Sequence, residues 1–115
     1  MELSTKYAAV VKLIDQANAG DPTSIDYKGE SQPKEQVYAS RHLAWVLNLQ
    51  PEASELLRIA AQTQHICRWE SPRSDYPMNR PGYLKWREDL KRFHAQRAGE
   101  LMAQVGYGTE DIERV

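Results

Sequence analysis

The sequence predicts an all-α fold, a single bundle of four to five helices. Apolar residues recur at spacings of three and four along several segments, which is the period of a helix with one buried face. Capping residues and prolines bound those segments, and no segment shows the alternation of a half-buried strand. The chain has 115 residues, of which 41% are hydrophobic and 27% charged. We therefore expect residues 1–115 to form one domain with one modest core.

The first helix is expected over residues 4–19. Ser4 is a suitable N-cap, because its hydroxyl can accept a hydrogen bond from a free backbone N–H group, and Gly20 is a common residue at a helix end. Residues 21–32 contain Asp-Pro, Gly and several polar residues, and are expected to form a loop. The apolar stripe of the helix follows the spacing of three and four: Tyr7, Val10, Val11, Ile14 and Ala17.

The second and third helices are expected to begin near prolines, which are tolerated in a first helical turn. The second runs from Pro33 to about Leu49, with His42 in a stripe of large aromatic residues. The third begins at Pro51 and runs to residues 67–69, and its broad apolar face indicates a well-buried helix. The stretch that follows contains two more prolines and is expected to be irregular.

The fourth helix is expected from Pro81 to Val105, with Gly106 in the left-handed conformation just past its end. Thr109 is a suitable N-cap for a short fifth helix, which has hardly begun when the chain stops. One turn adds little packing energy, because nucleation of a helix is costly. The last residues are therefore expected to be either a frayed tail or the start of a longer domain.

Composition excludes several classes of protein. No apolar run approaches the roughly 18–20 residues of a membrane span, and the N-terminus lacks the apolar core of a signal peptide. The single cysteine, Cys67, excludes an internal disulfide and fits a reducing compartment. A cytoplasmic location without membrane contact is therefore expected. A Gly-rich phosphate loop, a CxxC pair, an HExxH helix and a serine nucleophile elbow are all absent.

The charge is unevenly distributed along the chain. The formal net charge is −1, so no general attraction to nucleic acid is expected. Residues 61–99 hold eight basic and four acidic side chains, a net charge of +4, whereas residues 1–60 hold six basic and eight acidic ones. The second half could therefore present a basic surface to a phosphate. The alternative is a helix face whose charges pair with one another.

Three histidines, His42, His65 and His94, fall on three different expected helices. Antiparallel helices joined by short loops can bring such residues to one end of a bundle. Three imidazoles would suit a divalent metal such as zinc or iron. A neutral imidazole could instead act as a base or orient a substrate, and His65 is the candidate catalytic residue. The alternative is that each ring is half-buried, hydrogen-bonded and inert.

The stretch over residues 64–77 is the most informative part of the sequence. It gathers polar, aromatic and charged side chains that are costly to bury unless they pair. Glu70 is a candidate catalytic carboxylate near His65, and it could also be an extra metal ligand there, as could Cys67. The alternative for Glu70 is pairing with Arg68 or Arg73. The candidate substrate-binding residues combine guanidinium groups that can hold a phosphate with rings that can stack on a base: Arg68, Arg73, Arg80, Trp69 and Tyr76. Their alternative is to brace the loop.

Several segments resemble the family called domain of unknown function 4202. The resemblance is carried by IAAQTQHICRWESPRSDYPMNRPGYLKWREDLKRFHAQRAGELMAQVGY, and by PKEQVYASRHLAWVLNL and PEASELLRIAA before it. It covers nearly the whole chain. Members of this family continue through further helices, so the resemblance implies that the chain is the N-terminal part of a longer family domain. No activity is established for the family.

A weaker resemblance is to the HD superfamily of metal-dependent phosphohydrolases. His42 matches the first histidine of that pattern, and AAQTQHIC resembles the stretch that holds its His-Asp pair. Gln64 and His65 stand in the two places of that pair. The segment FHAQRAGELMAQVGYGTEDIERV resembles the part in which many HD proteins carry a further histidine, here His94. The resemblance implies an HD-like helical bundle.

Two functions are expected from these observations. The first is a divergent metal-dependent phosphohydrolase acting on a phosphate-containing small molecule, in which a metal on the three histidines activates water and Arg68 and Arg73 neutralise the phosphate. The second is a non-catalytic module that binds a nucleotide, RNA or a protein through the same basic and aromatic segment. An exposed apolar face could in addition drive formation of a homo-oligomer.

Overall fold

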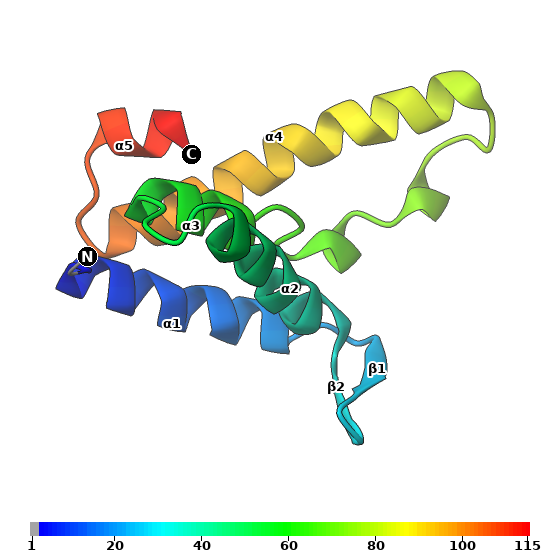
Figure 1. The fold of residues 1–115 in the computed structure, drawn as a ribbon. Helices are drawn as coiled ribbons and strands as arrows, with labels where there is room; N and C mark the ends of the chain where they lie inside the picture. Colours follow the sequence, from blue (N-terminus) through cyan, green and yellow to red (C-terminus); the bar gives the residue numbers. More distant parts are fainter. Residues whose placement is uncertain (1–2) are drawn as a thin grey trace.

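The computed structural model describes residues 3–115 and confirms a mostly helical fold (Figure 1). In this part of the chain α1 packs against α2, α3 and α4, and α5 folds back onto α4. None of the described helices combines the length and the apolar character that a membrane crossing requires. The elements are, in chain order, α1 (Thr5–Ala19), β1 (Ser24–Tyr27), β2 (Glu30–Pro33), α2 (Lys34–Leu49), α3 (Glu55–Gln62), η1 (Arg68–Glu70), η2 (Arg73–Asp75), α4 (Arg80–Gln104) and α5 (Thr109–Arg114).

Polar side chains cap the N-termini of α1, α3 and α4. Ser4 is the N-cap of α1, as predicted, and its hydroxyl accepts from a backbone N–H at 3.2 Å. Ser54 and Asn79 cap α3 and α4 in the same way. The prediction for the third helix is wrong at both ends, because Ser54 rather than Pro51 sets its start. After it the chain turns through Cys67, whose φ of 54° lies in the left-handed region and cannot continue a helix.

The prediction of a strandless loop over residues 21–32 is also wrong, because β1 and β2 form an antiparallel hairpin there. Lys28 and Gly29 have φ values of 53° and 84°, and positive φ at both central residues is the requirement of a tight hairpin turn. Each strand has four residues, of which two are exposed and two are only partly buried. The alternation of side chains along each strand is therefore too short to stand out in the sequence. Figure 1 shows the hairpin projecting from the bundle between α1 and α2.

The C-terminal segment returns along α4. Gly106 has a φ of 99°, which confirms the left-handed residue predicted after the long helix. The short fifth helix is present, but Gly108 is its N-cap and Thr109 is already its first helical residue. Ile112 packs closely on Gly99 of α4, since a Cβ at Gly99 would lie 3.1 Å from its Cγ2. The small residue lets the two helices approach.

The hydrophobic core lies where α1, α3 and α4 meet. Its side chains come from the predicted stripe of α1, from α3 and the turn after it, and from the C-terminal part of the chain. Burial of such side chains supplies most of the favourable free energy of folding. The buried members of this cluster are Tyr7, Val10, Ile14, Ile59, Ile66, Cys67, Met102 and Tyr107.

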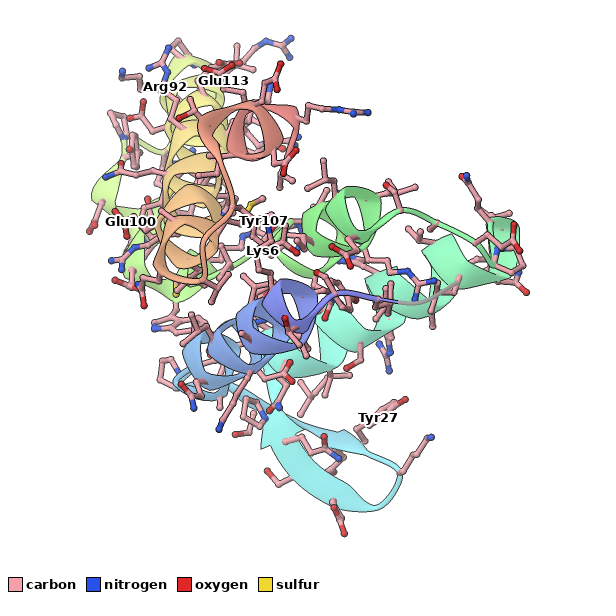
Figure 2. All side chains as sticks on the ribbon, turned by 90° about the vertical axis from the view of Figure 1, so that its left-hand side faces the viewer. Lys6, Tyr27, Arg92, Glu100, Tyr107 and Glu113 are labelled. Atoms are coloured by element: carbon pink, nitrogen blue, oxygen red, sulfur yellow. The ribbon has the colours of Figure 1, made fainter. Side chains whose placement is uncertain are left out.

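Glu55 of α3 links both ends of the chain. Its carboxylate accepts hydrogen bonds from the backbone N–H and the hydroxyl of Ser4, the latter at 2.9 Å, and from the hydroxyl of Tyr107 at 3.3 Å. Figure 2 shows Tyr107 beside Lys6, whose ammonium lies 4.9 Å from the centre of the Tyr107 ring. Burial alone would raise the pKa of Glu55, but these hydrogen bonds and the charge of Lys6 hold it below its ordinary value.

We expect stability to fall as the pH drops below the unfolded-state glutamate pKa of about 4.3. A carboxyl group with a lowered folded-state pKa contributes stability that is complete above the unfolded pKa and is lost as the pH falls through the folded pKa. Glu55→Gln should therefore reduce the acid sensitivity of the unfolding free energy, measured by chemical denaturation between about pH 3 and pH 7. Asp26→Asn, at an exposed carboxylate of β1, is the matched control. Equal acid sensitivity of wild type and Glu55→Gln would contradict this role.

Candidate functional site

Three imidazoles from different elements lie together in the fold. His42 comes from α2, His65 from the turn after α3, and His94 from α4. The ring centres of His42 and His65 are 5.3 Å apart in an edge-to-face contact, and those of His65 and His94 are 6.1 Å apart. Three residues separated by 23 and 29 positions in the sequence therefore share one place in the fold.

The surroundings keep His65 and His94 neutral near pH 7. The Nδ1 atom of His94 lies 2.9 Å from the carbonyl oxygen of Ile66, so Nδ1 carries the proton and Nε2 keeps its lone pair. Burial lowers the pKa of His94 by more than this hydrogen bond raises it. Burial, followed by the charge of Arg68 and the neighbouring imidazoles, lowers the pKa of His65 to about 4. Both rings can therefore accept a hydrogen bond or a proton.

His65 and His94 line an open cleft of about 410 Å³, the histidine cleft, between the turn after α3 and the facing part of α4. Three cations line it with them: Arg68, Arg87 and Lys91. None of the lining residues is an aspartate or a glutamate. A cleft lined by charges of one sign concentrates ligands of the opposite sign, so this cleft favours anions. Its remaining lining residues are Gln64, Tyr83, Trp86 and Leu90.

Arg68 is the cation with the most uncommitted donors. Its guanidinium lies 5.2 Å from the centre of the Trp86 ring and has no carboxylate or hydrogen-bond partner within residues 3–115. Arg87 donates to a tyrosine hydroxyl one turn away at 3.0 Å, and Lys91 pairs with Glu88 at 3.1 Å. A guanidinium stacked on a ring keeps its in-plane N–H groups available. Arg68 can therefore donate to a ligand without breaking a contact of this kind.

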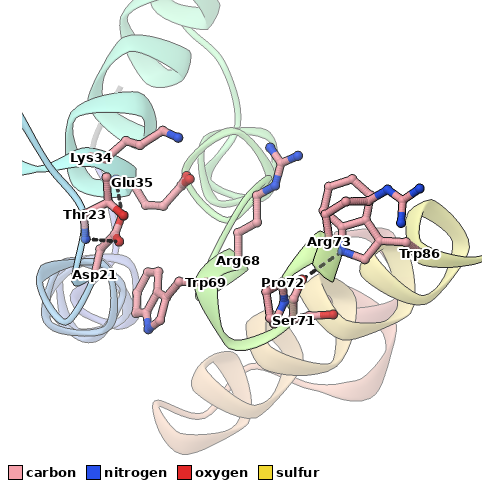
Figure 3. Close-up of a pocket in the computed structure, with 10 residues that line it drawn as sticks. All are labelled: Asp21, Thr23, Lys34, Glu35, Arg68, Trp69, Ser71, Pro72, Arg73 and Trp86. Carbon is pink, nitrogen blue, oxygen red and sulfur yellow. Dashed lines mark hydrogen bonds between the residues drawn. The ribbon is translucent and has the colours of Figure 1, made fainter. Parts of the chain in front are cut away.

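Arg68 also lines a second, smaller cavity of about 180 Å³ between the start of α2 and the 3₁₀ turns (Figure 3). Asp21 organises one wall of it, because its carboxylate accepts from the backbone N–H groups of Thr23 at 2.9 Å and Glu35 at 3.0 Å. These bonds attach the hairpin to the first turn of α2. Figure 3 shows the side chain of Glu35 between those of Lys34 and Arg68.

Glu70 and Tyr76 lie outside the histidine cleft. Glu70 is exposed and pairs with Arg97 at 2.8 Å, not with either of the arginines close to it in the sequence. The hydroxyl of Tyr76 donates to the carboxylate of Asp89 at 2.6 Å. Both side chains are thus engaged in contacts between the loop and α4.

Trp69, Arg73 and Arg80 lie outside the histidine cleft too. Trp69 and Arg73 line the smaller cavity, and Arg80 is exposed at the start of α4. Of the residues predicted to bind substrate, Arg68 is the one that the fold brings to His65 and His94.

Arg73 braces the loop that precedes α4. Its guanidinium donates to the carbonyl groups of Tyr76 at 3.3 Å, Pro77 at 2.9 Å and Asn79 at 3.4 Å. Gly82 allows the same loop to lie against the helix, since a Cβ there would be 2.1 Å from the carbonyl oxygen of Pro77. These contacts are those of a structural brace, the alternative that the sequence left open for Arg73.

Arg73→Ala is expected to lower the melting temperature by several degrees. Three carbonyl groups lose their shared donor, which costs about 1–2 kcal/mol when water replaces it only in part. Arg73→Lys should recover only part of the loss, because an ammonium lacks the planar fork. Thermal denaturation followed by circular dichroism measures the effect, with Arg80→Ala as the control at an exposed arginine nearby. An unchanged melting temperature would indicate that Arg73 serves a ligand instead.

The imidazoles as arranged do not present a closed set of metal ligands. Within residues 3–115, no group of three or more His, Cys, Asp or Glu side chains is placed to hold a metal ion. His94 uses Nδ1 for the Ile66 carbonyl, and His65 and His42 meet edge to face. Ligation would need the nitrogens to converge at about 2.0–2.1 Å from one point. The metal assignment of the three histidines stays a prediction.

The sequence does not single out Lys91 or Glu35 at all, nor Arg87 as part of a cleft. Arg87, Lys91 and His94 are spaced by four and three residues and share one face of α4, a pattern that could have linked them. Glu35 gives no such signal. It lies 3.7 Å from His65 only because the hairpin and Asp21 fix where α2 begins.

A family model described as Domain of unknown function (DUF4202) matches residues 8–115. The match includes the three histidines and every residue that lines the histidine cleft. Comparison with curated proteins and with solved structures found no match.

Proposed function

The chain belongs to the family of domain of unknown function 4202, and from its histidine cleft we propose that it binds a phosphate-containing small molecule. One observation carries the proposal. Arg68, Arg87 and Lys91 line a cleft that also holds two neutral imidazoles and has no aspartate or glutamate in its lining. The volume of about 410 Å³ falls within the usual range for small-molecule sites.

The chemistry of the lining suits a phosphate group. Phosphate oxygens accept charge-assisted hydrogen bonds, and a guanidinium can give two of them in parallel. Arg68 has its donors uncommitted, while the neutral rings of His65 and His94 can accept from a hydroxyl of the same ligand. Tyr83 adds aromatic surface at the same cleft, so a nucleotide is one member of the proposed class.

Hydrolysis of the bound compound is a second candidate function, favoured by the neutral state of His65 and His94. A neutral imidazole can take the proton of a water that attacks phosphorus, and the cleft cations can stabilise the charge that develops on the phosphate oxygens. This would make the protein a divergent HD-like phosphohydrolase. The alternative is a non-catalytic module that binds a nucleotide or RNA at the same cleft. An HD-like helix arrangement, a homo-oligomer and a cytoplasmic location stay predictions.

Calorimetric titration with inorganic phosphate, ribose 5-phosphate, AMP and ATP tests the proposal. In EDTA at low salt we expect at least one of them to bind, and to bind more weakly as salt is added. Absence of binding by all four, with or without Mn²⁺, would overturn it. If the compounds bind only in the samples that contain Mn²⁺, the result would support His42, His65 and His94 as metal ligands. Release of inorganic phosphate from bound ester separates a hydrolase from a binding module, and a short RNA in the same assay tests the RNA alternative.

A further inference from the structure

Two buried polar atoms beside the cleft face each other without a hydrogen bond. They are Oε2 of Glu35 and Nδ1 of His65, and both lack a partner within the described part of the chain. The distance between them is 3.7 Å. The side chain of Glu35 is 6% exposed and that of His65 is 32% exposed. A buried polar atom without a hydrogen bond lowers the stability of the fold. A hydrogen bond between these two atoms would remove that cost for both.

The two residues come from different elements that the fold brings together. Glu35 sits in the first turn of α2, where its backbone N–H is bound by Asp21. His65 follows α3 and lines the histidine cleft. A distance of 3.7 Å is longer than an N–H···O hydrogen bond of about 2.7–3.2 Å. Hydrogen bonds that orient catalytic side chains are often long without a ligand and shorten when one binds.

We propose that Glu35 is a positioning residue for His65, whose Nδ1–H it accepts so that the Nε2 lone pair is left for a ligand in the cleft. The inference rests on the proposed function for its purpose, because a ligand must use that lone pair. The carboxylate fixes the tautomer of the ring, as a carboxylate or carbonyl does for many functional histidines. Glu35 itself touches no ligand in this proposal.

His94 shows the same arrangement with a different acceptor. Its Nδ1 bonds to the carbonyl of Ile66 at 2.9 Å, which leaves Nε2 as the acceptor. With Glu35 in its proposed role, His65 and His94 both present Nε2 lone pairs in a cleft whose donors come from Arg68. Such a site fits a phosphate compound that also carries a hydroxyl, or a phosphate with a water beside it.

Charged groups of both signs surround the pair. Burial and the charge of Asp21 raise the pKa of Glu35, and the cations Arg68 and Lys34 oppose that shift. The groups acting on His65 are Arg68, His42, His94 and Lys34. When Glu35 is ionised its carboxylate can only accept, so the proton of the neutral His65 ring belongs on Nδ1 when the two atoms, now 3.7 Å apart, close.

The tautomer of His65 in the free protein tests the inference without any ligand. In ¹⁵N-labelled full chain near pH 7, two-bond ¹H–¹⁵N correlation spectra should show the proton of His65 on Nδ1. Glu35→Ala should shift it toward Nε2, because the acceptor is lost, and Glu35→Gln should shift it less, because an amide offers both an acceptor and a donor in the same place. His94 should keep its Nδ1 proton in all spectra, since Ile66 holds it, which also reports that a variant is folded. A proton on Nε2 of His65 in the wild type, or no change in either variant, would overturn the inference.

Titration with the phosphate compound that binds best gives a second, separate readout. Glu35→Gln should weaken binding by about tenfold, the effect of one ordinary hydrogen bond, and Asp26→Asn on the exposed hairpin should not change it. Equal affinity of Glu35→Gln and wild type would overturn the role of Glu35 in the site. Failure of the wild type to bind any phosphate compound would instead overturn the proposed function and leave the tautomer result to stand by itself.

Discussion

Replacing Ile59 with alanine is expected to lower the free energy of unfolding by about 2–5 kcal/mol. Ile59 is fully buried in the core cluster, with Ile14 of α1 and Met102 of α4 as other fully buried members. The change removes apolar surface from the core and leaves a cavity that the surrounding helices fill only in part. In a domain of this size the loss corresponds to roughly 8–20 °C in melting temperature.

Urea denaturation followed by circular dichroism measures the effect of Ile59→Ala. Leu49→Ala is the control, because Leu49 is 78% exposed at the end of α2, and a substitution on such a surface is expected to change stability by no more than about 0.5 kcal/mol. Similar losses in the two variants would mean that the core does not lie at the meeting of α1, α3 and α4.

Replacing Arg68 with alanine is expected to weaken the binding of a phosphate compound by about 10–150-fold. The change removes charge-assisted hydrogen bonding of about 1.5–3 kcal/mol in total. Arg68 is the natural choice among the three cations, because Arg87 and Lys91 already hold neighbouring side chains of α4. Arg68→Lys should recover part of the affinity, since it restores the charge without the planar fork.

Arg80→Ala is the matched control for the binding experiment, because Arg80 is exposed and lies outside the cleft. Its affinity for the same compound should equal that of the wild type. The melting temperature of Arg68→Ala should change little, because the guanidinium makes no ion pair within residues 3–115 and its contact with Trp86 adds only about 0.5–1 kcal/mol at a partly exposed site. Unaltered binding by Arg68→Ala would move the phosphate site away from this cleft.

The Ile59 and Arg68 variants test the hydrophobic core and the candidate site separately. Ile59 belongs to the cluster that holds α3 against α1 and α4, whereas Arg68 lies just after the left-handed turn at Cys67. A variant of the first kind should lose stability, and a variant of the second kind should lose binding at nearly constant stability. Arg73, which braces the next stretch of the loop, belongs with the first kind although it lies only five residues beyond Arg68.

Much of the fold could be predicted from the sequence because helices carry local signals. The stripe containing Val10 and Ile14 is buried as its spacing predicts. Ser4 caps α1 by accepting from an N–H three residues away, and Gly106 adopts the left-handed conformation by virtue of its own geometry. The hairpin escaped prediction because its strands have four residues each and little buried surface.

The candidate site could be predicted only in part. The excess of positive charge over residues 61–99 and the presence of three helical histidines are properties of the chain. Which cation meets which ring is a property of the fold, and Arg97 rather than a nearer arginine pairs with Glu70. Such pairings depend on where the helices cross. The residues within one helical turn carry no information about that crossing.

The amino-acid sequence by itself determined the helical class, the N-cap at Ser4 and the family to which the chain belongs, because each depends on residues close together in the chain or on their order. Only the tertiary structure decided that Glu35 lies against His65 and that Arg68 lines a cleft with His65 and His94. The physical reason is that burial, tautomer and pKa depend on every group within a few ångströms. Packing gathers those groups at the cleft from α2, the turn after α3, and α4.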